Sequence, residues 1–428
     1  MLQLQQLTET KVVENPGQYE VYCTAETPAP MCCLFGKPVV KNGTKQVMFF
    51  DTPAHGRRVG VWVARQRYKC GECGKTIYQA IPHMHPVHDM TERLVQYIKT
   101  KGTETTFTAL AIEIGVDVQT VRKIWRNHAR KELDKLQPKT PEWLGIDELF
   151  LMRSYRGVIT NVKERTLVDI LPSRSKPEVV RYLMGLEDRE KITLVAMDMW
   201  EPYRDAVTGV LPNAQIVVDR FHISRMASEA MERVRKELRL TLPRRGKLQL
   251  KDDRWMMLRA VEKLDATKTI LLQEMLQRFP LLNEAWHAKE SFRDIWQCTS
   301  REDAEKAYDA WCERLHPDVE PAFSDLQRAM RNWRKEVFNY FQWRVTNAYT
   351  ESFNSVARKM DRMGRGYSFE ALRAKLLLKH TLHKREPLKF TRSTPGPSLA
   401  MGLMQQPRLL GIDLSTLDAY LDTLPEVG

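Results

Sequence analysis

The sequence has no apolar run that approaches the roughly twenty residues needed to span a membrane as a helix. Its first residues, MLQLQQLTETKVVEN, are polar and lack the basic-then-apolar order of a secretory signal. These two absences argue against a membrane protein and predict a cytoplasmic one with no membrane partner.

Cysteine is scarce over most of the chain. Five of the seven cysteines lie between Cys23 and Cys73, and the remaining two stand far apart from them. A reducing cytoplasm does not sustain a disulfide framework, so a cluster of this kind favours metal binding.

Acidic residues are outnumbered by basic ones. The 67 lysines and arginines exceed the 54 aspartates and glutamates, which gives a formal net charge of +13 and a pI near 9.3. A basic balance that is spread along the sequence favours a polyanionic partner, most simply nucleic acid. The alternative is a basic protein with no such partner. At 428 residues the chain is long enough for two to four domains and a sizeable core.

Residues 1–88 are predicted to form a small zinc-binding β domain. Alternating apolar residues over 46–50 and 59–68 indicate antiparallel strands. Cys70 and Cys73 stand in KCGECGK, whose glycines let backbone N–H groups turn toward the thiolates of a zinc knuckle. Cys32 and Cys33 are the candidate second pair, although Phe35 occupies the place of the second cysteine in a C-x-x-C motif.

The fourth zinc ligand is left open by this spacing. Five further residues are candidates for it: Cys23, His55, His83, His85 and His88. The alternative is a β domain that has lost its metal and keeps two of the cysteines.

Residues 89–137 show the pattern of a helix-turn-helix DNA-binding domain. Apolar residues at spacings of three and four predict helices over 91–100, 107–114 and 119–133. Gly115 lies in the turn before the third helix, where that motif often needs a left-handed residue. The third helix presents a polar side suited to base edges and phosphates in a major groove: Gln119, Thr120, Arg122, Lys123, Arg126 and Arg130. The alternative is a three-helix packing unit without DNA contacts.

From Trp143 the pattern changes to that of an α/β domain. Three successive strands (WLGIDELFL, YRGVITNV and TLVDILP) precede a predicted helix over 176–186 and predicted strands over 192–197 and 215–218. This order predicts a mixed sheet. Residues 225–345 contain no convincing strand and are rich in Arg, Lys and Trp, so we expect an all-helical insertion into this core.

Three apolar runs of the core end on aspartates, Asp147, Asp198 and Asp219. The carboxyl ends of buried strands are where open α/β sheets place their ligands. After the insertion, Glu351 shares one helical face with the asparagines four residues before and three residues after it. Asp147, Asp198 and Glu351 are hard oxygen ligands suited to Mg²⁺ or Mn²⁺ in a two-metal site for in-line displacement at phosphorus.

Several motifs together resemble the ISL3 transposases of bacterial insertion sequences. They are the N-terminal cysteine domain, the helix-turn-helix, GIDE at 145–148, DMW-PY at 198–203, VLPNAQIVVDRFH at 210–222 and N-x-x-x-E-x-x-N at 347–354. The resemblance covers nearly the whole chain. It implies an RNase H-like core with a DDE triad, a helical insertion before the glutamate, binding of terminal inverted repeats and at least a dimer on DNA. It also implies a bacterial protein that joins the nucleoid when bound to DNA.

The resemblance assigns roles residue by residue. Asp147 and Glu351 match the first and last members of the triad, and Asp198 is assigned as the second. Asp219 and His222, in D-x-x-H, are assigned as supporting groups that orient the scissile phosphate or a flanking base. The reverse assignment, with Asp219 as the second ligand, stays open. For His222 the alternative is a buried histidine that satisfies a backbone carbonyl.

The sequence therefore predicts a multidomain α/β protein. Its expected parts are a zinc-binding domain (1–88), a helix-turn-helix (89–137), a first core segment (138–224), the insertion (225–345), and a second core segment with a C-terminal tail (346–428). The predicted function is that of a DNA transposase that cleaves and joins DNA at element ends with Mg²⁺ or Mn²⁺. The alternatives are a catalytically silent DNA-binding regulator derived from such an enzyme and an RNA-processing nuclease on a similar core.

Overall fold

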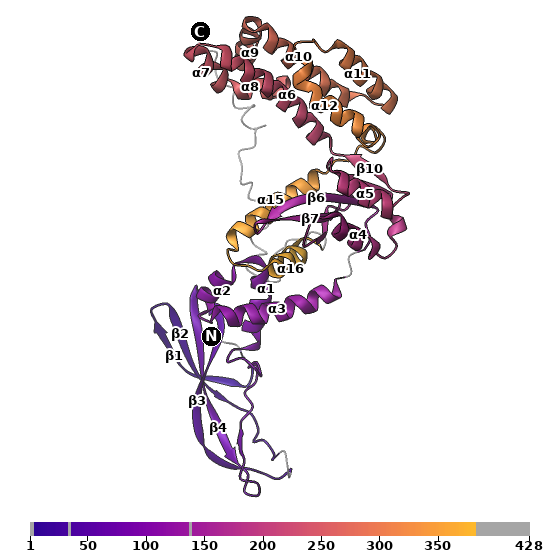
Figure 1. The fold of residues 1–428 in the computed structure, drawn as a ribbon. Helices are drawn as coiled ribbons and strands as arrows, with labels where there is room; N and C mark the ends of the chain where they lie inside the picture. Colours follow the sequence, from indigo (N-terminus) through magenta and orange to yellow (C-terminus); the bar gives the residue numbers. More distant parts are fainter. Residues whose placement is uncertain (1–3, 33–35, 137–138, 382–428) are drawn as a thin grey trace, which may run out of the picture. The chain divides into compact units, whose positions relative to one another are not determined.

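The computed structural model describes residues 4–32, 36–136 and 139–381 (Figure 1). Cys33, Phe35 and the expected C-terminal tail from residue 382 onward lie outside these described residues. Within them the chain forms two five-stranded sheets and many helices, a multidomain α/β architecture. None of the described helices combines the length and the apolar character needed to cross a bilayer.

The N-terminal sheet has the strand order β1-β2-β4-β3, with β5 paired to β4. Its strands are β1 (Leu7–Asn15), β2 (Gln18–Ala25), β3 (Val40–Ala54), β4 (Arg57–Lys69) and β5 (Thr76–Tyr78). The two predicted strands lie within β3 and β4 and pair antiparallel, as expected. The sheet as a whole is mixed, because β2 pairs parallel to β4. Its core consists of alternate residues of β2 and β4, among them Val21, Val61 and Val63.

Three helices follow, and side chains at their N-termini explain where each begins. They are α1 (Glu92–Glu104), α2 (Phe107–Ile114) and α3 (Val118–Lys135). The side chains of Thr91, Thr106 and Asp117 accept hydrogen bonds from backbone N–H groups in the first turns. Gly115 ends α2 with a φ of 75°, the left-handed conformation predicted for the turn. The helices bury one shared core that includes Leu94, Ile98, Leu110, Ile114, Val121 and Trp125.

The second sheet has the order β10-β9-β6-β7-β8. Three successive strands pair antiparallel: β6 (Trp143–Leu151) with β7 (Ser154–Asn161), and β7 with β8 (Thr166–Ile170). The strands β9 (Leu194–Met197) and β10 (Gln215–Val218) pair parallel on the other side of β6. The sheet is therefore mixed, as predicted. The helices α4 (Lys176–Met184) and α5 (Glu201–Val210) connect its strands, and α5 was not predicted.

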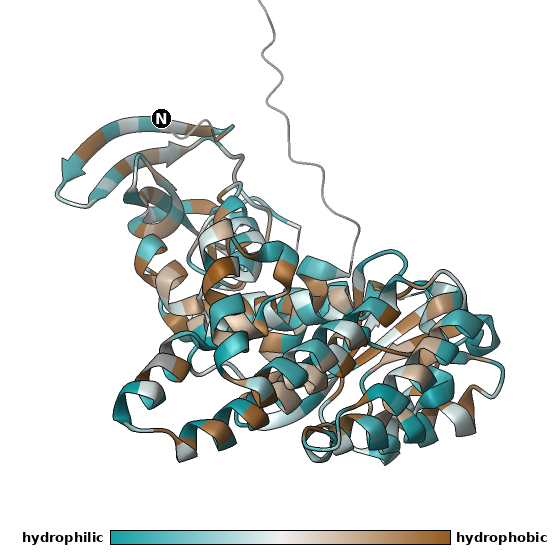
Figure 2. Ribbon diagram, turned by 90° about the horizontal axis from the view of Figure 1, so that it is seen from above, coloured by the Kyte–Doolittle hydropathy of each residue, from teal (hydrophilic) through white to brown (hydrophobic). Residues whose placement is uncertain are grey.

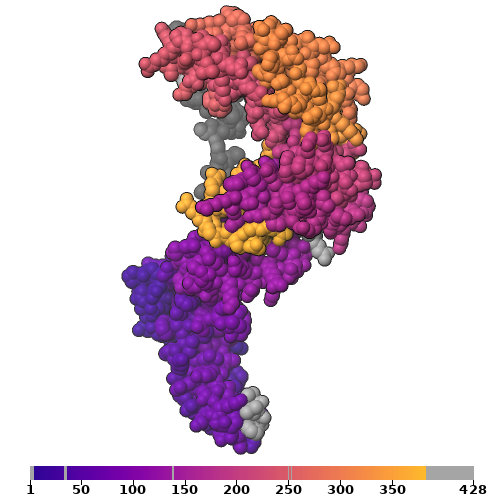
Figure 3. Space-filling model, in the orientation of Figure 1, coloured from indigo at the N-terminus to yellow at the C-terminus, as the bar shows by residue number. Residues whose placement is uncertain are grey.

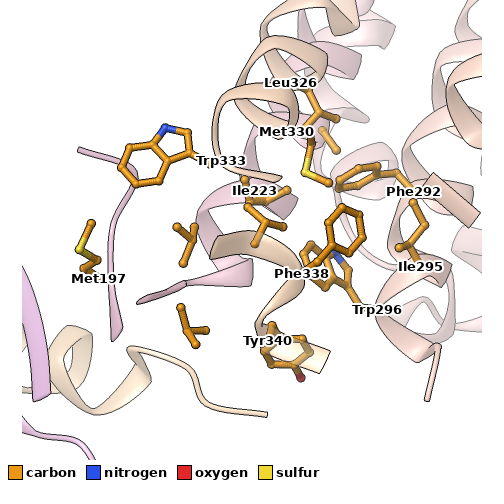
Figure 4. Packing of buried hydrophobic residues seen from close by; sticks show 14 of the residues in the cluster. Met197, Ile223, Phe292, Ile295, Trp296, Leu326, Met330, Trp333, Phe338 and Tyr340 are labelled. Carbon is orange, nitrogen blue, oxygen red and sulfur yellow. The ribbon is translucent and has the colours of Figure 1, made fainter. Parts of the chain in front are cut away.

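A long helical region leaves the sheet after β10. It comprises α6 (Arg220–Thr241), α7 (Arg244–Asp252), α8 (Arg254–Leu258), α9 (Ala266–Arg278), α10 (Pro280–Asp294), α11 (Arg301–Arg314), α12 (Glu320–Asn332), α13 (Arg334–Phe338) and α14 (Tyr340–Trp343). In Figure 2 hydrophobic residues (brown) and hydrophilic residues (teal) alternate along the helices. The apolar sides form one core that is continuous with β9 and β10. Figure 4 shows part of it, where Phe292, Trp296 and Phe338 gather near Ile223 of α6.

Two helices then return to the sheet, α15 (Ala348–Met363) and α16 (Phe369–His380), whose atoms are yellow in the space-filling view of Figure 3. Helix α15 lies against β6, and its approach is close at Gly145. A Cβ atom on Gly145 would come within 2.8 Å of Thr350 Oγ1 of α15 and closer still to Thr160 Oγ1 of β7. The glycine of the GIDE motif therefore lets the helix carrying Glu351 reach the strand carrying Asp147.

Candidate functional site

A polar cleft of about 760 Å³ brings Asp147, Asp198, His222 and Glu351 together. These residues come from β6, the end of β9, the first turn of α6 and the first turn of α15. Its full lining is Asp147, Glu148, Arg174, Asp198, Met199, Trp200, Tyr203, His222, Arg225, Met226, Glu229, Glu351, Asn354, Ser355 and Arg358. Four of the five predicted catalytic residues thus share one cavity although they are distant in sequence.

Asp147 ends the apolar run WLGID but lies in the middle of β6, which has the bounds of the predicted strand WLGIDELFL. Strand β6 continues to Leu151 because it pairs with β7 along its whole length. On its other side, however, the last parallel pair joins Ile146 to Met197, the final residue of β9. Asp147 follows directly after this pair and opens into the cleft. Asp147 is therefore open to the cleft because the neighbouring strand β9 ends beside it, and not because β6 ends.

The carboxyl of Asp147 is buried and held by two donors. Its Oδ2 accepts a 2.6 Å hydrogen bond from Nδ2 of Asn354, and its Oδ1 accepts a 2.7 Å hydrogen bond from the backbone N–H of Glu148. Burial raises the pKa of Asp147 to about 8, and the nearby carboxylate of Asp198 adds to this rise. The pKa of Glu351 is also raised, mainly by its partial burial and then by Asp219. Carboxyls crowded in this way repel one another, and a bound cation relieves that repulsion.

Asp198 and His222 form an ion pair. Asp198 follows β9 directly, and its Oδ1 lies 2.9 Å from Nδ1 of His222. The carboxylate raises the pKa of His222, since it stabilises the protonated ring. The alternative interpretation of His222 was a buried histidine that satisfies a backbone carbonyl. That interpretation did not foresee a carboxylate, Asp198, as the partner of the ring.

Asp219 has a different environment from Asp198. It is 1% exposed and caps α6, because its side chain accepts a 3.0 Å hydrogen bond from the backbone N–H of Phe221. It also accepts a 3.1 Å hydrogen bond from the backbone N–H of Asn347, at the start of α15. Burial raises its pKa. Ligand atoms of Asp219, His222 and Glu351 lie within 4.8 Å of one another. Asp219 therefore ties the start of α15 to the end of β10, beside the residues that line the cleft.

Three residues that sequence reasoning did not assign also line the cleft: Arg174, Trp200 and Tyr203. The Arg174 guanidinium pairs with Glu148 and lies 4.9 Å from the ring centre of Trp200. Tyr203 donates a 3.4 Å hydrogen bond to the backbone carbonyl of Asp147. The two aromatic residues follow Asp198 within the DMW-PY motif, which was a usable signal. The position of Arg174, in a loop before α4, gave none.

Three of the four predicted zinc ligands come together. The thiol groups of Cys32, Cys70 and Cys73 lie within 4.8 Å of one another, and the Sγ atoms of Cys32 and Cys73 are 3.7 Å apart. Cys33 and Phe35 lie outside the described residues.

The loops around Cys32 and Cys70 share one backbone pattern. Cys32 N–H donates to Lys37 O at 2.9 Å, and Gly36 N–H donates to Cys32 O at 2.7 Å. The same two bonds, both 3.0 Å, join Cys70 to Lys75 and Gly74 to Cys70. Both glycines have the positive φ that such a turn requires.

The candidates for a fourth zinc ligand lie elsewhere among the described residues. Cys23 is in the hydrophobic core of the first sheet, where burial raises the pKa of its thiol to about 11. His55 packs edge-on against Tyr19, His83 contacts the Gln5 carbonyl, and His85 stacks on His88.

The six predicted DNA-contacting residues of α3 separate into two groups. Gln119 and Lys123 are exposed near the start of the helix, with Thr120 and Arg122 half-buried beside them. Arg126 and Arg130 are also exposed, and they line a cavity of about 700 Å³ formed by α3, β8 and α16.

Comparisons with known proteins agree on one class. The sequence model of the ISL3-type DDE family, described as a transposase, matches residues 144–376. The transposase of insertion sequence element IS1001 from Bordetella parapertussis is 23% identical over 365 residues, covering 83% of this chain and 89% of that protein. The transposase of IS1557 from Mycobacterium tuberculosis is 24% identical over 292 residues, covering 62% of this chain and 65% of that protein.

Proposed function

Since the family match spans more than half of its residues, the chain belongs to the ISL3 family of DDE transposases, and we propose that it cleaves and joins DNA at the terminal inverted repeats of its own element. We propose Asp147, Asp198 and Glu351 as the catalytic triad. The observation that carries this proposal is their convergence on one cleft from three separate elements.

The strand order supports an RNase H-like core for the second sheet. Three antiparallel strands, β6 to β8, continue into two parallel strands, β9 and β10, and a helix that carries the last acidic residue covers β6. In this proposal residues 225–345 are the insertion that separates the two parts of the core, residues 139–224 and 346–381 within the described chain.

The donor set suits Mg²⁺ or Mn²⁺. Carboxylate oxygens are the ligands that these ions prefer, and the buried carboxyl of Asp147 has the carboxylates of Asp198 and Glu351 nearby. When bound, such ions activate the attacking hydroxyl and stabilise the leaving oxygen of a phosphodiester. Asp147, Asp198 and Glu351 would hold them.

Other residues of the cleft position the triad. Asn354 donates to Asp147 and fixes the orientation of its carboxyl. His222 pairs with Asp198, while Asp219 holds the backbone at the start of α15 in place. Arg358 supplies positive charge at the cleft wall, and Arg174 and Arg225, which pair there with Glu148 and Glu229, add guanidinium donors suited to the phosphates of a DNA strand.

We further propose that α2 and α3 form a helix-turn-helix that reads the terminal repeats, with Gln119, Thr120, Arg122 and Lys123 toward the DNA. Arg126 and Arg130, exposed one and two turns further along α3, are proposed as phosphate contacts. We also propose zinc bound by Cys32, Cys70 and Cys73, and at least two copies of the chain acting on paired DNA ends.

The test uses duplex DNA that spans the boundary of the element carrying this gene. The wild-type chain with Mg²⁺ is expected to cut at the element end, mapped to the nucleotide, and Asp147→Ala is expected to bind but not cut. Asp205→Asn, which removes an exposed aspartate of α5 outside the cleft, is the matched control. Undiminished cleavage by Asp147→Ala would overturn the proposal.

A further inference from the structure

Lys375 of α16 is a buried cation among aromatic rings and carbonyl groups. Its side chain is 1% exposed, and its ammonium lies 4.3 Å from the ring centre of Phe107 and 5.0 Å from that of Trp125. It donates to the backbone carbonyl of Gly102 and, at 2.8 Å, to that of Thr105. Among the residues that the structure describes, no carboxylate forms a salt bridge with it. Burying an ammonium without an anion is unfavourable, and both this burial and neighbouring Lys379 lower the pKa of Lys375 to about 7.

Two more lysines line the same pocket, which has a volume of about 350 Å³. Lys359 comes from α15 and Lys379 from α16, and both are exposed. Two hydroxyl-bearing residues, Thr103 near the end of α1 and Thr105 just after it, also line the pocket. The rest of the lining includes the apolar side chains of Val356, Met360 and Met363 and the ring of Tyr367. The ammonium and hydroxyl donors suit a group with one or two negative charges and several acceptor oxygens.

One acidic residue opposes this chemistry. Glu104 also lines the pocket, but it is largely exposed, and its carboxylate is 3.6 Å from the ammonium of Lys101. The two exposed lysines, Lys359 and Lys379, therefore outnumber this one glutamate, which already has a cationic partner.

We propose that this pocket binds one phosphate group of the DNA backbone. The proposal rests on the transposase function proposed above, because the pocket is lined by elements to which that function assigns DNA binding and catalysis. Its walls come from the α1–α2 segment of the three-helix unit and from α15, the helix that carries Glu351. On α15 the neighbouring residues Arg358 and Lys359 line the cleft and the pocket respectively. With a rise of about 1.5 Å per residue, Lys359 lies about 12 Å along the helix from Glu351. A strand that leaves the cleft over α15 thus reaches the pocket within a few nucleotides.

The first experiment measures the salt dependence of duplex binding by the full chain. Each phosphate contact contributes about −0.9 to the slope of log K against log salt. The double variant Lys359→Ala, Lys379→Ala is expected to lower the magnitude of that slope by about 0.9. The control, Lys263→Ala with Lys335→Ala, removes the same charge from two exposed lysines outside the pocket. An equal change of slope in both variants, or no change in either, would overturn a specific backbone contact at this site.

The second experiment separates the pocket from DNA binding, with inorganic phosphate as the probe. Phosphate, compared with chloride at equal ionic strength, is expected to raise the melting temperature of the wild-type chain and of the control but not of Lys359→Ala, Lys379→Ala. If the wild-type chain fails to bind duplex DNA, the proposed function is wrong, and this arm still decides the phosphate site. If phosphate stabilises the chain and the DNA slope does not change, the ligand is a free phosphate compound and the backbone proposal is overturned.

A third variant, expected to strengthen phosphate binding, distinguishes loss of the site from a defect in folding. Glu104→Gln removes the carboxylate that repels an anion, so it is expected to lower the phosphate concentration needed for a given thermal shift. The lysine and glutamine variants must therefore move the phosphate response in opposite directions. Weaker phosphate binding by Glu104→Gln would contradict the proposal.

Discussion

Asn354 donates a 2.6 Å hydrogen bond to the carboxyl of Asp147 across a separation of 207 residues. Both side chains are buried, at 2% and 5% exposure, so water cannot easily replace either partner. The pair joins α15 to β6 and aims the carboxyl of Asp147 toward the cleft.

Replacing Asn354 with alanine is therefore expected to weaken metal binding. Groups that orient a metal ligand contribute about 10–100-fold to affinity. The Mn²⁺ concentration that gives half-maximal strand cleavage should rise by that factor, while duplex binding is retained. Ser352→Ala, an exposed neighbour on α15, is the control and should behave as the wild type.

The raised pKa of Asp147 predicts how stability depends on pH in the absence of divalent metal. Its pKa is about 8 in the folded chain and about 3.9 in an unfolded one. The unfolded state therefore loses its proton first, and the metal-free chain should become less stable as pH rises from about 4 to about 8. Urea unfolding at a series of pH values in a chelator measures this, and Asp147→Asn should flatten the dependence. Parallel curves for the two proteins would show that Asp147 is not its source.

Gly145→Ala tests the close approach of α15. The added Cβ would meet the hydroxyl oxygens of Thr160 and Thr350, so we expect a loss of about 1–3 kcal/mol in the free energy of unfolding. Thr160→Ala in the same chain should restore part of it. Gly209→Ala provides the contrast, since a Cβ at Gly209 in α5 meets nothing within 4 Å. This change should stabilise the chain by about 0.5–1 kcal/mol.

Cys70→Ser is expected to remove zinc from the N-terminal domain. Elemental analysis should find one zinc per wild-type chain, less than one-tenth of that in Cys70→Ser, and an unchanged content in Cys312→Ser, which lies in α11. Loss of the metal should also lower the melting temperature, because zinc holds the two cysteine loops together. Equal zinc in all three proteins would place the metal elsewhere.

Two variants of α3 should separate base reading from phosphate contact. Gln119→Ala is expected to cost about 1–3 kcal/mol on the terminal repeat and little on unrelated DNA. Lys123→Ala should weaken binding to both duplexes and lower the salt slope by about 0.9. Competition binding at several salt concentrations distinguishes the two patterns, and identical losses on both duplexes for Gln119→Ala would exclude a base contact.

Local patterns in the sequence were sufficient to predict the three helices α1 to α3 and all five strands of the second sheet. The helix over 107–114 and the strand over 215–218 have the predicted bounds, because each is an apolar segment between residues that stop it, such as Thr106 and Gly115. The third helix extends one residue earlier and two later than predicted, since Asp117 caps it and its amphipathic pattern continues to Lys135. Among the described residues between β10 and α15 no strand occurs, as expected.

The features that sequence reasoning missed are set by contacts between distant residues. That the cleft opens at Asp147, in the middle of β6, depends on where the neighbouring strand β9 stops. The pairing of His222 with Asp198 depends on the rotation of α6 against β9, which spacing within D-x-x-H does not reveal. Lys375 lies in a run of leucines and lysines typical of a surface helix, yet α16 packs between the sheet and the three-helix core and buries it.

The helical region of α6 to α14 also has a consequence for the order of synthesis. A ribosome makes Asp147 and Asp198 first, then this whole region, and only afterwards Glu351 and Asn354. A nascent or prematurely terminated chain therefore carries α1 to α3 but not the last acidic wall of the cleft. The complete acidic cleft can therefore form only after most of the polypeptide has left the ribosome.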